Sequence, residues 1–213
     1  MSRRLSHLLL GGILITGQAM AQICETDTSL QTAPTANFVS ENPDPARYPV
    51  SLAEDGSEVL DLATGLVWQR CSLGQVWDAQ NRRCLGLARK LTWQEALQQA
   101  KALANDSGKA WRLPNLKELV SIVEFQCQAP PFNLEVFPDT PASVPAPEDP
   151  SLNDGFGSGY WSASPLVSID AYNTRQFRYA WYLDAHLGET RWKPVTSGEA
   201  GVAYYKNFVR LVR

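Results

Sequence analysis

The sequence predicts an α+β domain in which a pair of short strands, two amphipathic helices and a group of antiparallel strands follow one another along the chain. Three observations predict this class. Apolar residues recur at helical spacing only between residues 92 and 123, and short runs typical of strands lie on both sides of that region. The four cysteines are an even number, which suits two disulfide bonds. Because the helices form one block and do not alternate with strands, a parallel α/β sheet is not favoured.

The first 21 residues read as a secretory signal peptide. Arg3 and Arg4 precede an apolar run at 8–15, and the Ala-Met-Ala sequence at 19–21 is a typical cleavage motif. A lipoprotein signal is less favoured, because the residues before Cys24 are not the small ones that lipidation uses. We therefore expect an exported protein, periplasmic or extracellular at the cell surface, with no transmembrane segment after cleavage.

Residues 22–54 are polar and rich in proline, and we expect them to form an extended arm before a domain at 55–213. Three pairings of the cysteines are open. We favour Cys71–Cys84, which closes a local loop, and Cys24–Cys127, which ties the arm to the domain. A zinc site is not indicated, since there is no C-x-x-C pair and only His186 remains after signal cleavage.

The domain begins with two short strands, 59–61 and 66–68, around the turn Ala63-Thr64-Gly65. The loop from Cys71 to Cys84 follows and contains Trp77.

Both predicted helices begin with a capping box, in which two side chains satisfy backbone N–H groups at the helix start. Thr92 and Glu95 form the first box, and residues 105–108 provide the stop. Asn115 and Glu118 form the second. Each helix has one apolar stripe: Trp93, Ala96, Leu97, Ala100, Leu103 and Ala104 in the first, and Leu116, Leu119, Val120 and Val123 in the second.

The second helix is preceded by Trp111-Arg112-Leu113-Pro114. On an extended backbone Arg112 lies on the face opposite Trp111 and Leu113. We expect a structural junction of Arg112, Pro114, Asn115 and Glu118, in which the guanidinium pairs with an acid or braces carbonyls at the corner. The less favoured alternative is that Arg112 grips an anionic ligand.

Seven of the fourteen prolines lie between residues 130 and 150, within a long excursion at 130–158. The last third of the chain predicts strands at 160–163, 180–183, 190–192 and 208–212. Residues 186–189 are expected to form a hairpin turn between two of them.

Charge and aromatic residues point to a candidate binding surface at this hairpin. The chain without its first 21 residues has 17 basic and 22 acidic residues, whereas residues 171–213 have a net charge of +4. This distribution permits a local anionic ligand but argues against general nucleic-acid binding. Trp77, Trp181 and Trp192 are the tryptophans best placed for an exposed platform. We assign these ligand-binding residues: Trp181, His186, Arg191, Trp192, Lys193, Arg175 and Arg178. Scattered solvated charges are the alternative.

No catalytic site is indicated. His186 has no cysteine or serine partner at a recognisable spacing, and Ser162 and Ser164 lack a G-x-S-x-G context. No cofactor is expected. Oxygen ligands for Ca²⁺ occur in the long excursion, but without a calcium-loop spacing: Glu148, Asp149, Asn153 and Asp154.

Five sequence motifs occur in one order: TGLVWQRC at 64–71, TWQEA at 92–96, WRLP at 111–114, YWSAS at 160–164 and VRLVR at 209–213. The series resembles the bacterial exported domain family named after the C-terminal domain of the Legionella collagen-like adhesin, over about residues 55–213. The family is similar to C-type-lectin-like and formylglycine-generating-enzyme-like folds, which implies a C-type-lectin-like mixed fold. The enzymatic relatives need reactive cysteines late in the chain, and none follows Cys127 here.

The resemblance implies a non-catalytic exported domain that recognises an anionic glycan or a surface ligand, since the adhesin binds sulfated glycosaminoglycans. This chain has no collagen-like Gly-X-Y region. The alternative is a structural or interaction module of an envelope or surface assembly, for which the Pro-rich excursion would dock on a partner protein.

Overall fold

The computed structural model describes residues 23–24, 47–48, 53–128, 130–141, 159–169, 175–195 and 205–213. Their elements follow in this order: β1 (Ile23–Cys24), β2 (Glu58–Asp61), β3 (Leu66–Gln69), β4 (Val76–Asp78), β5 (Arg83–Leu85), α1 (Trp93–Ser107), α2 (Leu116–Ser121), β6 (Cys127–Gln128), β7 (Gly159–Ile169), β8 (Arg175–Asp184) and β9 (Thr190–Pro194). All strand pairs of the sheets are antiparallel. The α+β class predicted from the sequence is confirmed.

β2 and β3 form the predicted strand pair, with Val59 opposite Trp68. Gly65 has a φ of 71°, in the left-handed region that suits glycine, and closes the turn between the strands. The carboxylate of Asp61 is fully buried and receives Arg47 through two hydrogen bonds, from Nε at 2.7 Å and Nη2 at 2.6 Å. This pair fastens residue 47 to the turn of the domain.

The loop from Cys71 to Cys84 contains a hairpin, β4–β5, that the sequence did not predict. The Cys71–Cys84 disulfide is present, as predicted, and links two residues whose Cα atoms lie 5.5 Å apart. Trp77 lies opposite Cys84 in the ladder. Asp78 Oδ1 accepts backbone N–H bonds from Gln80 and Asn81, which builds the turn. We call residues 71–84 the stapled hairpin.

The two capping boxes are confirmed, with Thr92 and Glu95 at α1 and Asn115 and Glu118 at α2. Gly108 ends α1 in the left-handed conformation. α2 is shorter than the predicted stripe, because the helix ends at Ser121. Val123 is buried beyond the helix and forms an isolated bridge with Phe132.

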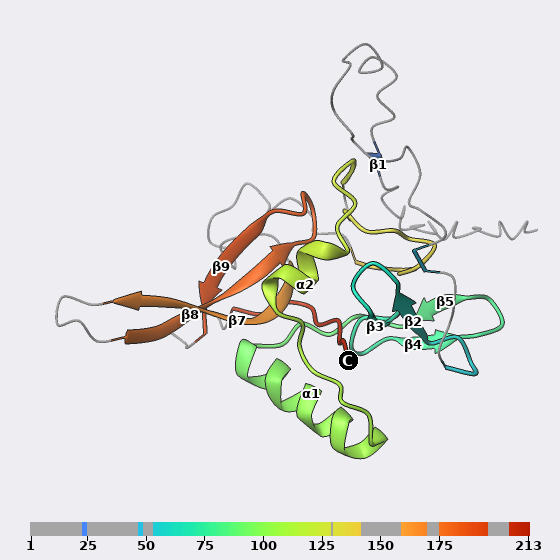
Figure 1. The fold of residues 1–213 in the computed structure, drawn as a ribbon, viewed down its shortest axis with the longest axis horizontal. Coiled ribbons are helices and arrows are strands. Elements are labelled where there is room, and N and C mark those ends of the chain that lie inside the picture. The colour runs from blue at the N-terminus through green and yellow to red at the C-terminus, as the bar shows by residue number, and fades with distance from the viewer. Residues whose placement is uncertain are drawn as a thin grey trace, which may run out of the picture.

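β7, β8 and β9 form a three-stranded sheet in which β8 is central. β7 and β8 are longer than predicted, and β8 and β9 are joined at the predicted turn, where Gly188 has a φ of 75°. In Figure 1 this sheet and the β2–β5 strands lie on opposite sides of α2 and the C-terminal end of the chain, with α1 beneath them.

Residues 208–212 were predicted to form a strand, and this prediction is wrong. The segment makes isolated bridges to Tyr160, Trp68 and Arg112. Its backbone changes neighbours almost at each step: Leu211 and Arg213 accept from β3, whereas Phe208 accepts from Trp161 and Val212 accepts from Arg112. Because each of these bridges is isolated, the segment joins none of the ladders of the named strands.

The core lies between these elements and is rich in aromatic residues. Trp68, Trp161 and Tyr160 are fully buried, and Trp111 is almost fully buried. Arg210 is also buried within this core, where its guanidinium lies 4.6 Å from the centre of the Phe137 ring. No helix in the described part of the chain has the length and apolar character needed to cross a bilayer.

Candidate functional site

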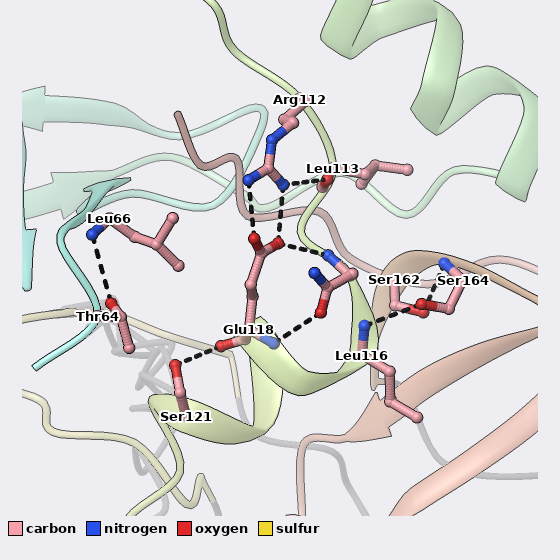
Figure 2. Close-up of polar contacts among 10 residues, drawn as sticks. Thr64, Leu66, Arg112, Leu113, Leu116, Glu118, Ser121, Ser162 and Ser164 are labelled. Atoms are coloured by element: carbon pink, nitrogen blue, oxygen red, sulfur yellow. Dashed lines mark hydrogen bonds and ion pairs between the residues drawn. The ribbon is translucent and has the colours of Figure 1, made fainter.

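The predicted junction before α2 is built around the ion pair of Arg112 and Glu118 (Figure 2). Arg112 Nη1 donates to Glu118 Oε2 at 2.7 Å, and Nη2 donates to Oε1 at 2.8 Å. Nη1 also donates to the carbonyl of Leu113 at 3.2 Å. The two structural roles expected for Arg112, pairing with an acid and bracing a carbonyl, therefore occur together.

Glu118 belongs to this ion pair and to the capping box at once. Its Oε2 accepts the backbone N–H of Asn115 at 2.7 Å, and its own N–H donates to Asn115 Oδ1 at 3.0 Å. The hydrogen bond from Arg112, followed by that from the Asn115 backbone, lowers the pKa of Glu118. The same pair raises the pKa of Arg112.

The junction is also attached to β7. The N–H of Leu116 donates to Ser164 Oγ at 3.0 Å, and the N–H of Ser164 donates to Ser162 Oγ at 3.2 Å (Figure 2). The carbonyl of Pro114 accepts the N–H of Ala163 at 2.7 Å. Arg112 is 47 % exposed but both of its terminal nitrogens bind Glu118, and neighbouring backbone groups attach β7, so the geometry fits a folding junction.

The register of β8 and β9 places the predicted aromatic residues on one face of the sheet. Trp181 lies opposite Trp192, and directly opposed residues of an antiparallel pair share a face. Trp192 is 50 % exposed and its ring centre lies 4.9 Å from that of Tyr179, with the rings nearly perpendicular. Trp181 is partly buried. We call Tyr179, Trp181 and Trp192 the aromatic face.

The predicted cations of β9 lie on the other face. Arg191 is opposite Tyr182, and Lys193 is opposite Ala180. Lys193 is only 1 % exposed, donates to Asn207 Oδ1 at 3.0 Å and lies 4.8 Å from the centre of the Tyr182 ring. The prediction that Lys193 belongs to an accessible binding surface is therefore corrected. Lys193 faces the interior, where residue 207 covers the sheet.

The other predicted ligand-binding residues lie around this hairpin without forming one cluster. Arg191 donates to Glu189 at 2.7 Å, a hydrogen bond that raises the pKa of Arg191. Arg178 is exposed, and its carbonyl accepts from Val195. His186 is partly buried, and its backbone N–H donates to Asp184 at 2.8 Å. Arg175 begins β8, and its side chain lies outside the described residues.

Several predictions fall outside the described part of the chain. These include the Ca²⁺ candidates Glu148, Asp149, Asn153 and Asp154, and most of the Pro-rich excursion. Among the residues that the structure does describe, no three histidine, cysteine or acidic side chains gather as a metal site.

One cavity was missed by the sequence reasoning. A pocket of about 480 Å³ lies between the turn at 53–56, Arg70 and the stapled hairpin, where Trp77 and Arg82 line it. The sequence predicted Trp77 for an exposed platform together with Trp181 and Trp192, but the structure places it in this pocket, on a different sheet from the other two. The sequence does not show that Arg70 and Arg82 are neighbours, because they meet only through the β4–β5 hairpin, which was not predicted.

Among known families, the model described as the Lcl C-terminal domain matches residues 57–213. This region is nearly that of the motif series at about 55–213, and the resemblance seen in the sequence is confirmed. No curated protein and no solved structure matches the chain.

Proposed function

Because the chain belongs to the Lcl C-terminal domain family, we propose that it is a non-catalytic ligand-binding domain whose aromatic face recognises a glycan. The family is one of exported proteins. Export would bring such a domain into contact with the polysaccharides of an envelope or a surface.

The observation that carries the proposal is the half-exposed Trp192, held against Tyr179 and opposite Trp181. Aromatic rings present an apolar surface with a negative face, against which the C–H groups of a sugar ring can pack. Two paired strands fix these rings more rigidly than a loop would. A preformed surface of this kind loses little conformational entropy when it binds.

The anionic character of the ligand rests on Arg191 and Arg178. Arg191 lies next to Trp192 on the edge strand β9, although it faces the other side of the sheet, whereas Arg178 is an exposed residue of the central strand β8. The formal charge of +4 over residues 171–213 adds little to this preference, because two of its cations, Lys193 and Arg210, are buried. Arg191 would have to exchange its pairing with Glu189 for a ligand sulfate or carboxylate.

The test measures binding of the full chain to immobilised heparin and to neutral dextran. We expect Trp192→Ala to weaken heparin binding roughly tenfold, because removal of a central aromatic anchor from a binding surface costs about 1.4 kcal/mol or more. Phe125→Ala is the matched control, since Phe125 is an exposed aromatic residue outside this sheet.

Arg191→Gln tests the anionic preference, and Lys193 is unsuitable because it is buried. We expect Arg191→Gln to reduce both heparin binding and its dependence on salt. Absence of wild-type binding to both glycans, or equal losses in Trp192→Ala and Phe125→Ala, would exclude the aromatic face as a glycan site.

The C-type-lectin-like fold and the second disulfide, Cys24–Cys127, remain part of this proposal. Two observations support them. The segment at 208–213 returns to bridge Trp68 and Arg112, which closes the domain on itself. β1 pairs with β6 in a register that sets Cys24 opposite Cys127.

A further inference from the structure

The pocket beside the stapled hairpin differs from the aromatic face in location and chemistry. Its walls come from the turn at 53–56, from the residue after β3 and from the β4–β5 hairpin. A volume of about 480 Å³ lies within the range of small-molecule sites. The residues that matter are Glu54, Asp55, Arg70, Trp77 and Arg82.

Arg70 is a buried cation with an incomplete set of partners. It is 7 % exposed, and its Nη1 donates to the carbonyl of Val136 at 2.9 Å. Nε has no partner, and within the described part of the chain no carboxylate pairs with this guanidinium. Arg47, by contrast, has such a partner: its Nε and Nη2 hold the carboxylate of Asp61 through two hydrogen bonds. A buried charge that lacks such a partner costs free energy.

Arg82 brings a second positive charge to the same pocket. Its side chain is exposed and, among the described residues, takes part in no ion pair. Its backbone has a φ of 52°, in the left-handed region. Burial, and after it the charge of Arg82, lowers the pKa of Arg70. An anion between the two guanidinium groups would relieve both effects.

The rest of the lining fits an uncharged, hydroxylated ring. Trp77 is partly exposed, and its indole Nε1 donates to the carbonyl of Asp55 at 2.7 Å, which fixes the ring. Arg70 Cζ lies 5.5 Å from the centre of that ring. Glu54 and Asp55 add carboxylate oxygens, which accept hydrogen bonds from hydroxyl groups.

The charges of the lining select the size of the anion. Two arginines and two acidic residues balance one another, so the pocket does not attract a polyanion. A single carboxylate satisfies the arginines, and its planar shape matches the fork of a guanidinium. The remaining groups then face a ring that has hydroxyls on its edge and C–H groups on its face.

We propose that this pocket binds a sugar acid, with its carboxylate between Arg70 and Arg82 and its ring against Trp77. The site is independent of the aromatic face, because no residue is shared between them.

The test is an NMR titration of the isotope-labelled full chain with glucuronate, with glucose and with glucose 6-sulfate. We expect saturable shifts of the Trp77 indole N–H signal with glucuronate, and at least roughly tenfold weaker binding of glucose, which lacks the charged acceptor. Arg82→Gln should weaken glucuronate binding by a similar factor. Arg83→Gln is the matched control, because Arg83 is the next residue and pairs with Asp139 outside the pocket lining.

Four results would overturn the proposal: no saturable binding of glucuronate, equal binding of glucose, tighter binding of glucose 6-sulfate, or equal losses in Arg82→Gln and Arg83→Gln. Arg82 is exposed, so its replacement leaves the fold intact. Trp192→Ala separates the two sites. It should leave glucuronate binding unchanged even where heparin binding is lost, and a loss of glucuronate binding would place the sugar acid on the aromatic face instead.

Discussion

At the scale of single residues, Glu118 joins the start of α2 to the extended segment before it. Its carboxylate receives Arg112 and the N–H of Asn115 together. A carboxyl group whose pKa is lower in the folded than in the unfolded chain adds stability above its unfolded pKa, near 4.5 for glutamate. That stability is lost as the pH falls through the lowered value.

We therefore predict that Glu118→Gln lowers the free energy of unfolding by about 1 kcal/mol at pH 7, which combines a weakened cap with a half-exposed ion pair. The deficit should shrink as the pH falls below about 4.5 and vanish at a pH below the lowered pKa of Glu118, because the wild-type carboxyl is then protonated too. Urea unfolding at the two pH values measures it. The exposed Glu135→Gln serves as control, and a deficit that is independent of pH would contradict the electrostatic explanation.

The role of Glu118 was predictable because a capping box depends on residues only three positions apart. The burial of Lys193 was not predictable in this way. Alternation along β9 correctly separates Trp192 from Arg191 and Lys193, but which face is covered depends on residue 207, distant in sequence. Arg70 and Arg82 were missed for the same reason, since a hairpin absent from the prediction brings them into one pocket.

At the scale of elements, one disulfide closes the stapled hairpin and a second is predicted to join residue 24 to β6. Cys71–Cys84 is present, whereas Cys24–Cys127 stays a prediction that the β1–β6 register favours. We predict that proteolysis without reduction yields one cross-linked peptide pair for each bond. Mass spectrometry identifies the pairs, and a peptide joining Cys24 to Cys71 or Cys84 would contradict the assignment. Loss of a native disulfide costs roughly 2–4 kcal/mol, so Cys24→Ser with Cys127→Ser should lower stability by that amount.

Elements with strong local signals were predicted well. α1 has a capping box and an apolar stripe, and its start agrees with the prediction, whereas the helix continues through residues 105–107 of the predicted stop and ends at Gly108. β4 and β5 were not predicted, because strands of three residues between charged and polar neighbours show no usable alternation. Residues 208–212 are apolar like a buried strand, yet their backbone partners lie far away in sequence and form only isolated bridges, which no local pattern reveals.

At the scale of the whole molecule, Arg210 connects distant parts of the domain. Its Nη1 donates to the carbonyls of Gln69 and Arg70, and its Nη2 donates to Thr140 Oγ1 at 2.7 Å. Burial lowers the pKa of Arg210. Only the planar guanidinium of arginine reaches these acceptors at once, and lysine offers a single ammonium group.

We predict that Arg210→Lys destabilises the domain by about 3 kcal/mol or more, because buried acceptors lose their donors while a buried charge remains. For a chain of this size, that loss lowers the melting temperature by roughly 6–12 °C. Arg83→Lys is the control, since its exposed pair with Asp139 contributes less than about 1 kcal/mol. Similar melting temperatures for the two variants would show that Arg210 is not the connector inferred here.

The segment at 205–213 also bears on how fast the chain reaches its native state. Gln69 and Arg210 lie 141 positions apart, and the backbone of the same segment meets β3, Arg112 and β7. Contacts between such distant positions require large loops to close before the core gains stability, which makes folding slow. Many export systems move a chain across the membrane in its unfolded state. A domain that folds slowly stays unfolded for longer than one built from local contacts, and it therefore remains fit for such export for longer.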